Sequence, residues 1–180
     1  MSASALSRRS CFLAAFSLVL MAGLTACSYQ SVRHLDRQPW VAGTDRKLSM
    51  KYLTFEYVTE LAPRGMRILG TAYPKRPDIP GWADWAQDIW LATYLCNDMG
   101  KVLAKQISIL PPQKLSPDTG FDFDFHLEPK DMAGNSPVFI TFGYRLMLLA
   151  DRDVELEALK ATSSNDNGLF FASESALTRF

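Results

Sequence analysis

A stretch of strict alternation at 121–128, FDFDFHLE, limits the possible fold more than any other feature of the chain. Every second residue is a large apolar one: Phe121, Phe123, Phe125 and Leu127. The residues between them are polar: Asp122, Asp124, His126 and Glu128. Neighbouring side chains of a strand point to opposite faces, so this period predicts a strand with one face in a core and the other in water. Such half-solvated strands are typical of antiparallel sheets.

Further segments have strand composition and are separated by proline and glycine turns. They are 48–60, 66–74, 89–98, 101–110 and 138–149. The first two read as a hairpin around Pro63-Arg64-Gly65, and 153–160 fits a strand slightly better than a short helix. Six or seven strands without an amphipathic helix predict an all-β fold, an antiparallel β-sandwich.

The N-terminus has the layout of an export signal. Arg8 and Arg9 precede the apolar, uncharged run 11–26, which ends at Cys27. A membrane-spanning helix needs about 20 apolar residues, and this run is shorter. We therefore expect residues 1–26 to be a signal peptide rather than a membrane span.

Leu24-Thr25-Ala26-Cys27 resembles the bacterial lipobox. In proteins with that signal, the cysteine thiol receives a diacylglycerol, and cleavage frees an amine that is usually acylated too. A thiolate is a strong nucleophile, and a single acyl chain holds a protein only marginally at a bilayer. The resemblance implies a lipoprotein bound to membrane lipid through Cys27; the alternative is a signal anchor with an incidental cysteine.

The sequence also bears on the membrane that holds the anchor and on the route of export. Residue 28 is Ser rather than Asp, so resemblance to enterobacterial lipoproteins favours the outer membrane, facing the periplasm, over the inner one. Residues 7–12, SRRSCF, approach the twin-arginine export pattern, although Cys11 stands where an apolar residue is usual. The general secretory route is favoured, and both routes stay open.

The mature chain is expected to hold one domain. Residues 27–46 are polar, without a sustained period, and read as a lipidated tether; 47–162 form the sandwich; 163–180 are either a frayed tail or a pairing strand. Loss of two arginines with the signal leaves 17 of 19 basic residues against 19 acidic ones. This near-neutral balance argues against nucleic acid as a partner. Cys96 is then the sole cysteine besides Cys27, which excludes an intramolecular disulfide between unmodified thiols.

The middle of the chain resembles the small immunoglobulin-like FxLYD domains of bacterial envelope proteins. The resemblance rests on LGTA at 69–72, NDMGKVLA at 97–104 and LSPDTGFDF at 115–123, and covers roughly 50–128. It departs in the insertion WADWAQD at 82–88 and at 117–120, where two residues separate Pro from Gly. It implies an immunoglobulin-like sandwich and says little about function.

The polar face of 121–128 carries the residue types that bind metals, but it predicts no metal site. Alternate side chains of one strand point in parallel about 7 Å apart, so they do not converge on one ion. A solvated face is the favoured interpretation, and no residue set indicates a cofactor or a catalytic group. An envelope hydrolase or metal-dependent enzyme that uses His126 and nearby carboxylates stays as the alternative.

Two tryptophans mark the insertion that follows Pro77 and Pro80. Trp82 and Trp85 either cover the edge of the sandwich or form an aromatic patch for a protein partner or glycan, because Trp is favoured at binding hot spots. Cys96 reads as a buried small apolar residue. The sequence thus predicts a non-catalytic envelope lipoprotein, a binding or assembly module with Trp82 and Trp85 as candidate partner contacts.

Overall fold

The computed structural model describes residues 28–116, 118–129, 137–150 and 169–179. It separates two compact units, Met1–Tyr29 with Thr178–Phe180, and Gln30–Leu177. The predicted signal peptide, Cys27 and the segment 153–160 lie outside the described residues. Among those that are described, no helix has both the length and the apolar character needed to cross a membrane.

Twelve strands occur in the described residues, more than the six or seven predicted. They are β1 (Tyr29–Ser31), β2 (Gln38–Pro39), β3 (Arg46–Ser49), β4 (Leu53–Ala62), β5 (Gly65–Pro74), β6 (Trp85–Cys96), β7 (Val102–Leu110), β8 (Gln113–Lys114), β9 (Phe121–Leu127), β10 (Phe139–Leu149), β11 (Leu169–Glu174) and β12 (Leu177–Arg179). A single 3₁₀ turn, η1 (Arg76–Asp78), precedes β6. Seven strands have six residues or more, and the excess over the prediction consists of strands of two to four residues.

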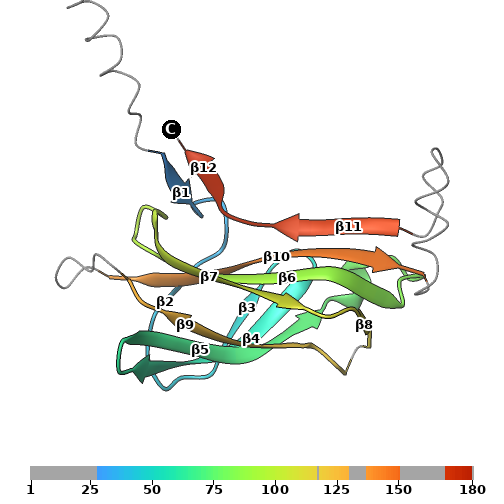
Figure 1. The fold of residues 1–180 in the computed structure, drawn as a ribbon, viewed down its shortest axis with the longest axis horizontal. Coiled ribbons are helices and arrows are strands. Elements are labelled where there is room, and N and C mark those ends of the chain that lie inside the picture. Colours follow the sequence, from blue (N-terminus) through green and yellow to red (C-terminus); the bar gives the residue numbers. More distant parts are fainter. Residues whose placement is uncertain (1–27, 117, 130–136, 151–168, 180) are drawn as a thin grey trace, which may run out of the picture. The chain divides into compact units, whose positions relative to one another are not determined.

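The strands of the second unit form two antiparallel sheets. One has the order β11-β10-β6-β7, with β2 beside β10 and β8 beside β6, and the other has the order β3-β4-β5-β9 (Figure 1). The strands β1 and β12 pair in a small sheet of their own. The prediction of an all-β antiparallel sandwich is confirmed.

The β4–β5 hairpin lies where the sequence predicts it. Its register runs without a break from Leu53 opposite Pro74 to Ala62 opposite Gly65. Gly65 has a φ of 117°, and a Cβ there would lie 2.2 Å from the backbone oxygen of Leu127. Only glycine fits this turn, because a side chain would be strained and would also collide with β9.

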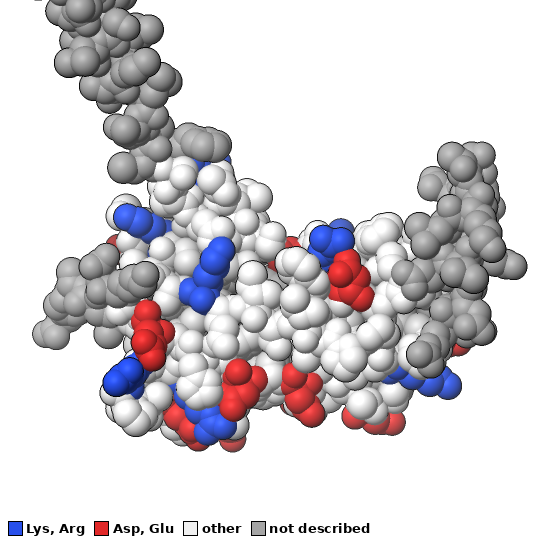
Figure 2. All heavy atoms as spheres, viewed as in Figure 1, with Lys and Arg blue, Asp and Glu red and all other residues white. Residues whose placement is uncertain are grey.

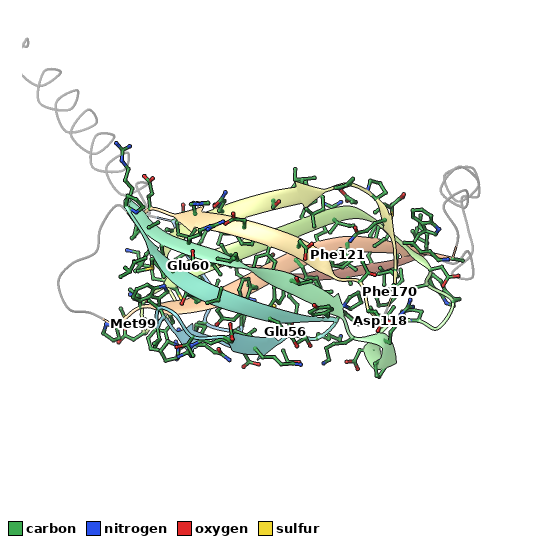
Figure 3. The ribbon with its side chains drawn as sticks, turned by 90° about the horizontal axis from the view of Figure 1, so that it is seen from below. Glu56, Glu60, Met99, Asp118, Phe121 and Phe170 are labelled. Atoms are coloured by element: carbon green, nitrogen blue, oxygen red, sulfur yellow. The ribbon has the colours of Figure 1, made fainter. Side chains whose placement is uncertain are left out.

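Aromatic rings fill the space between the two sheets (Figure 3). Phe55 on β4 and Phe123 on β9 both contact Phe142 on β10, with ring centroids 4.2 and 5.5 Å from its own. The alternation at 121–127 has the predicted sense: the Phe and Leu side chains of β9 are buried, and its Asp and His side chains are exposed. Burial of a phenylalanine contributes about 1.5–3 kcal/mol, so this cluster is a main source of stability.

The residues from 30 to 46, which the sequence predicts as part of a tether, lie within the folded unit. Val32 is fully buried, and its N–H donates a 2.8 Å hydrogen bond to the carbonyl of Gly100. Leu35 belongs to the same hydrophobic core, and the Thr141 hydroxyl donates to the Asp36 carbonyl at 2.6 Å. This part of the chain is therefore packed against the sandwich rather than free of it.

At the other end, β11 pairs with β10 from Tyr144 opposite Glu174 to Leu149 opposite Leu169. Of the two interpretations of residues 163–180, the pairing strand is the one seen for 169–174. The strand β6 also begins at Trp85, four residues before the predicted start at Ile89, so the insertion is shorter than the sequence suggests.

Candidate functional site

The outer face of the six-stranded sheet carries large apolar side chains that remain exposed. Ile107 and Ile109 on β7 are 45% and 67% exposed, Trp90 on β6 is 37% exposed, and Phe171 on β11 is 62% exposed. Trp90 lies directly opposite Ile109, and Phe171 lies opposite the half-buried Met147 of β10. Single exposed apolar residues are ordinary, but a group on one face marks a contact surface. We call these five residues the Trp90 face.

The pairing register of β7, β6 and β10 produces a groove in this surface. One row across the sheet places Lys105 opposite Tyr94, and another places Ile109, Trp90 and Arg145 in line. The row between them holds Ile107, Ala92 and Gly143. Because rows on one face are about 7 Å apart, the small side chain of Ala92 in the middle row leaves a groove between two rows of larger ones.

The groove is a cavity of about 310 Å³. Its lining consists of Gln30, Trp90, Ala92, Tyr94, Lys105, Ile107, Tyr144, Arg145, Ser173, Ser175 and Ala176. The last three residues of this lining come from β11 and the chain that follows it, so the pairing of β11 with β10 completes the site. All of the lining belongs to the unit Gln30–Leu177.

Tyr94 forms a fixed wall of the groove. A Cβ on Gly143 would lie 2.9 Å from the Tyr94 ring, so the glycine lets this ring lie across β10. The backbone N–H of Ala176 donates a 3.4 Å hydrogen bond to the Tyr94 hydroxyl. Burial raises the pKa of Tyr94, so the ring presents a neutral surface at physiological pH.

Arg145 is held on the opposite wall by two contacts. Its Nη2 lies 2.6 Å from Oδ2 of Asp88, and its guanidinium lies 5.6 Å from the centre of the Trp90 ring, in a cation–π arrangement. Asp88 has a φ of 50° and lies where the β6–β10 register shifts between Arg145 and Met147. An irregularity of this kind redirects side chains, and here it brings the carboxylate to Arg145.

Lys105 differs from Arg145 in its surroundings. No carboxylate is among the groove-lining residues, and within the part of the chain that the structure describes Lys105 has no ion pair. In the view of Figure 2, acidic and basic side chains follow the lower margin of the molecule, and a few others lie over its middle and upper parts. The groove therefore combines apolar walls with one unneutralised positive charge.

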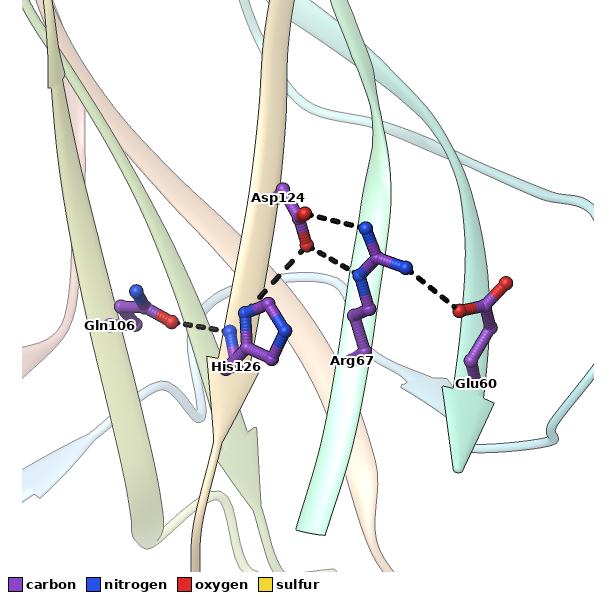
Figure 4. Close-up of polar contacts among 5 residues, drawn as sticks. All are labelled: Glu60, Arg67, Gln106, Asp124 and His126. Carbon is purple, nitrogen blue, oxygen red and sulfur yellow. Dashed lines mark hydrogen bonds and ion pairs between the residues drawn. The ribbon is translucent and has the colours of Figure 1, made fainter. Parts of the chain in front are cut away.

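The other sheet presents a polar outer face (Figure 4). Arg67 on β5 binds both carboxylate oxygens of Asp124 at 2.9 and 2.7 Å, and its Nη1 lies 3.3 Å from Glu60. Nδ1 of His126 lies 3.7 Å from the same Asp124 carboxylate. The hydrogen bonds from Arg67 lower the pKa of Asp124, so this carboxylate stays ionised and paired.

His126 also takes part in closing one edge of the sandwich. Its backbone N–H donates a hydrogen bond to the side-chain oxygen of Gln106 on β7, so the edge strands of the two sheets are joined there. The described residues contain no group of three or more His, Cys, Asp or Glu side chains placed to hold a metal ion. The imidazole of His126 is thus exposed and lies beside the Asp124 carboxylate, which Arg67 already binds.

The structure separates the two tryptophans that the sequence singles out. Trp82 lies in the loop before β6 and is 42% exposed, whereas Trp85 is half-buried at the start of β6, opposite Leu149 and Lys114. Neither of these two tryptophans is among the residues that line the groove.

The insertion that carries them is pinned to the sandwich. Arg76 donates hydrogen bonds to the carbonyls of Ala83 and Leu115 at 2.9 and 2.8 Å. The Asp84 N–H donates to Leu149, and the Asp84 carbonyl accepts from Leu115. Ala83 is fully buried. The end of the segment thus continues β6 between β10 and the chain that follows β8, while Trp82 remains at the surface.

Sequence reasoning missed Trp90, Ile107 and Ile109. The available signal for Trp90 was that 89–98 is apolar on both of its faces. In a two-layer sandwich only one face of that strand meets the core. On the other face Trp90 is exposed, whereas Ala92, Tyr94 and Cys96 are buried.

Comparison of the chain with protein-family models, with curated proteins and with solved structures finds no match.

Proposed function

We propose that this chain is a lipid-anchored, non-catalytic protein of the bacterial envelope that binds a partner protein through the Trp90 face. The observation that carries the proposal is the group of exposed apolar side chains from β6, β7 and β11 on one face, two of which, Trp90 and Ile107, line a groove. The lipobox-like sequence at residues 24–27 supports the anchoring, and acylated Cys27 would hold the chain to membrane lipid.

The composition of the face favours a protein over a glycan. Ile107, Ile109 and Phe171 have no polar atoms to bond with sugar hydroxyls, but they contribute free energy when another apolar surface covers them. Trp90 and Arg145 are of the types most enriched at protein hot spots, and here they contact each other. Trp82 and Trp85, at and before the start of β6, remain candidate contacts.

The position of the anchor suits a protein that works beside the membrane. Only Ser28 and Tyr29 separate Cys27 from Gln30, the first residue of the folded unit. An acyl group on Cys27 would therefore be connected to the domain by two residues rather than by the long tether predicted from the sequence. Partners of such a domain are expected among proteins at the same membrane surface.

The alternative of an enzyme that uses His126 receives less support. Both oxygens of the carboxylate that lies beside the imidazole are bound by Arg67, so this carboxylate is held as an ion pair and is poorly placed to act as a general acid or base itself. The groove on the other sheet is lined by residues without a histidine or a carboxylate.

Site-specific photo-crosslinking in the intact envelope tests the proposal. A photoreactive amino acid at Ile109 should yield a discrete crosslinked protein, and Trp90→Ala should reduce that product severalfold. The matched position is Asp122, which is exposed on the outer face of the four-stranded sheet. The same product from position 122, or a product at 109 that survives Trp90→Ala, would contradict the assignment of this face.

A further inference from the structure

We infer that the groove of the Trp90 face binds a small apolar carboxylate, with the acid group on Lys105 and the apolar body over Ala92, between Trp90 and Tyr94. This inference rests on the proposed binding role of the face and specifies a ligand for its groove.

The size of the groove indicates a small ligand. A volume of about 310 Å³ lies at the lower end of the range of about 300–1,000 Å³ found for small-molecule sites. The floor is Ala92, and the larger side chains Trp90 and Tyr94 lie in the rows to either side of it. A flat ring or a short chain can therefore lie on the floor with Trp90 on one side and Tyr94 on the other.

The charges indicate an anion. Arg145 is already matched by Asp88 at 2.6 Å, whereas Lys105 has no ion pair among the described residues. A carboxylate on the ligand would supply a charge-assisted hydrogen bond to the Lys105 ammonium. The hydroxyls of Ser173 and Ser175 provide further donors in the lining.

The single unmatched cation also sets the charge of the ligand. A phosphate monoester carries about −1.5 to −2 charges near pH 7, so it would bring more negative charge into the groove than Lys105 neutralises. A carboxylate carries one charge and leaves the site balanced. The apolar walls then select acids with a ring or an alkyl body over small hydrophilic ones such as acetate.

The test compares an acid with its uncharged amide. Full-length protein in phosphatidylcholine nanodiscs is dialysed to equilibrium against 2-naphthoate or 2-naphthamide, with empty nanodiscs as the blank. We expect the acid to bind about tenfold more tightly, because a charge-assisted hydrogen bond contributes about 1.4 kcal/mol or more. Lys105→Gln should remove this preference, and Lys114→Gln, which changes an exposed lysine on β8 outside the groove, should preserve it.

Two further variants test the location. Ala92→Leu should fill the floor and abolish binding of both compounds, with the urea midpoint recording whether the variant folds. If it does not fold, Ile107→Glu replaces it: this half-exposed position tolerates a polar residue, and its carboxylate would repel the acid. Equal affinity for acid and amide, or a preference that survives Lys105→Gln, would overturn the inference.

The outcomes for ligand and partner can be distinguished. If naphthoate fails to bind while crosslinking at Ile109 still depends on Trp90, the ligand inference is wrong and the partner role stands. If naphthoate binds with the expected preference while no crosslink depends on Trp90, the groove is a ligand site and the partner role is wrong.

Discussion

The ring of Phe55 on β4 stacks on the ring of Phe142 on β10, with centroids 4.2 Å apart and planes 3° from parallel. The two residues belong to different sheets, so their contact joins the layers of the sandwich. Tyr57 meets the same Phe142 ring edge-on at 4.9 Å. Phe142 is therefore the point where side chains of both sheets converge.

Phe142→Ala should lower the free energy of unfolding by about 3–5 kcal/mol, the usual cost of truncating a buried aromatic side chain. Urea denaturation measures the loss. The matched variant is Ile109→Ala, because Ile109 is exposed on the outer face of the same sheet and should change stability by no more than about 0.5 kcal/mol. Equal losses from the two variants would mean that the outer face is covered by protein.

The packing of residues 30–46 can be tested in the same way. Leu35→Ala should cost about 2–3 kcal/mol, since Leu35 is only 7% exposed and lies in the core cluster. Val41→Ala, at an exposed position of the same segment, is the control and should be nearly silent. An unchanged urea midpoint for Leu35→Ala would restore the free tether that the sequence predicts.

Strands long enough to show a period were predictable, and short ones were not. The alternation of β9 fixed its buried face, and turn chemistry at Pro63 and Gly65 located the β4–β5 hairpin. In contrast, β1, β2 and β3 have two to four residues each, which is too few for a period of two to stand out. Val32 and Leu35 are buried by long-range contacts with the Gly100 turn and the core. Contacts of this kind cannot be inferred from the local sequence pattern.

The candidate site depends even more on long-range register. Trp90 and Arg145 are 55 positions apart in the sequence and become neighbours only because β6 pairs with β10. The same pairing sets Gly143 beside Ala92, where the glycine leaves room for the Tyr94 ring that forms one wall of the groove. The sequence indicated that tryptophans could form a contact surface, but it could not show which of them would contact Arg145 and line the groove.

The thiol of Cys96 should be unreactive in the folded protein. Burial raises its pKa to about 11, so the reactive thiolate is scarce at pH 8 and becomes abundant only as the pH approaches that value. We expect no reaction with a disulfide reagent at pH 8 without denaturant, and full reaction in urea. Rapid reaction of the native protein would show that the strand β6 opens or that Cys96 is accessible.

Thiol counting also tests the anchor. In urea, the mature chain should release one equivalent per molecule, from Cys96, because the Cys27 sulfur would be held in a thioether. A second reactive equivalent in the mature chain would contradict acylation of Cys27.

Cys27→Ala should block lipidation and leave an unprocessed precursor, because the lipobox cysteine supplies the sulfur that is acylated. Metabolic labelling with a radioactive fatty acid and electrophoretic mobility measure the two effects. Cys96→Ala is the matched control and should leave both unchanged. Labelling that persists in Cys27→Ala would mean that the chain is anchored by another residue.

The two tryptophans of the insertion should differ in what their removal changes. Trp82→Ala should leave the urea midpoint nearly unchanged, since its side chain is 42% exposed in a loop whose backbone is held by Arg76. Trp85→Ala should lower the midpoint, because Trp85 is half-buried in β6 between β8 and β10. If Trp82 contributes to the partner surface, Trp82→Ala should weaken the crosslink at Ile109 without a loss of stability. If Trp82→Ala crosslinks like the wild type, Trp82 is not part of the partner surface, and that surface is confined to the Trp90 face.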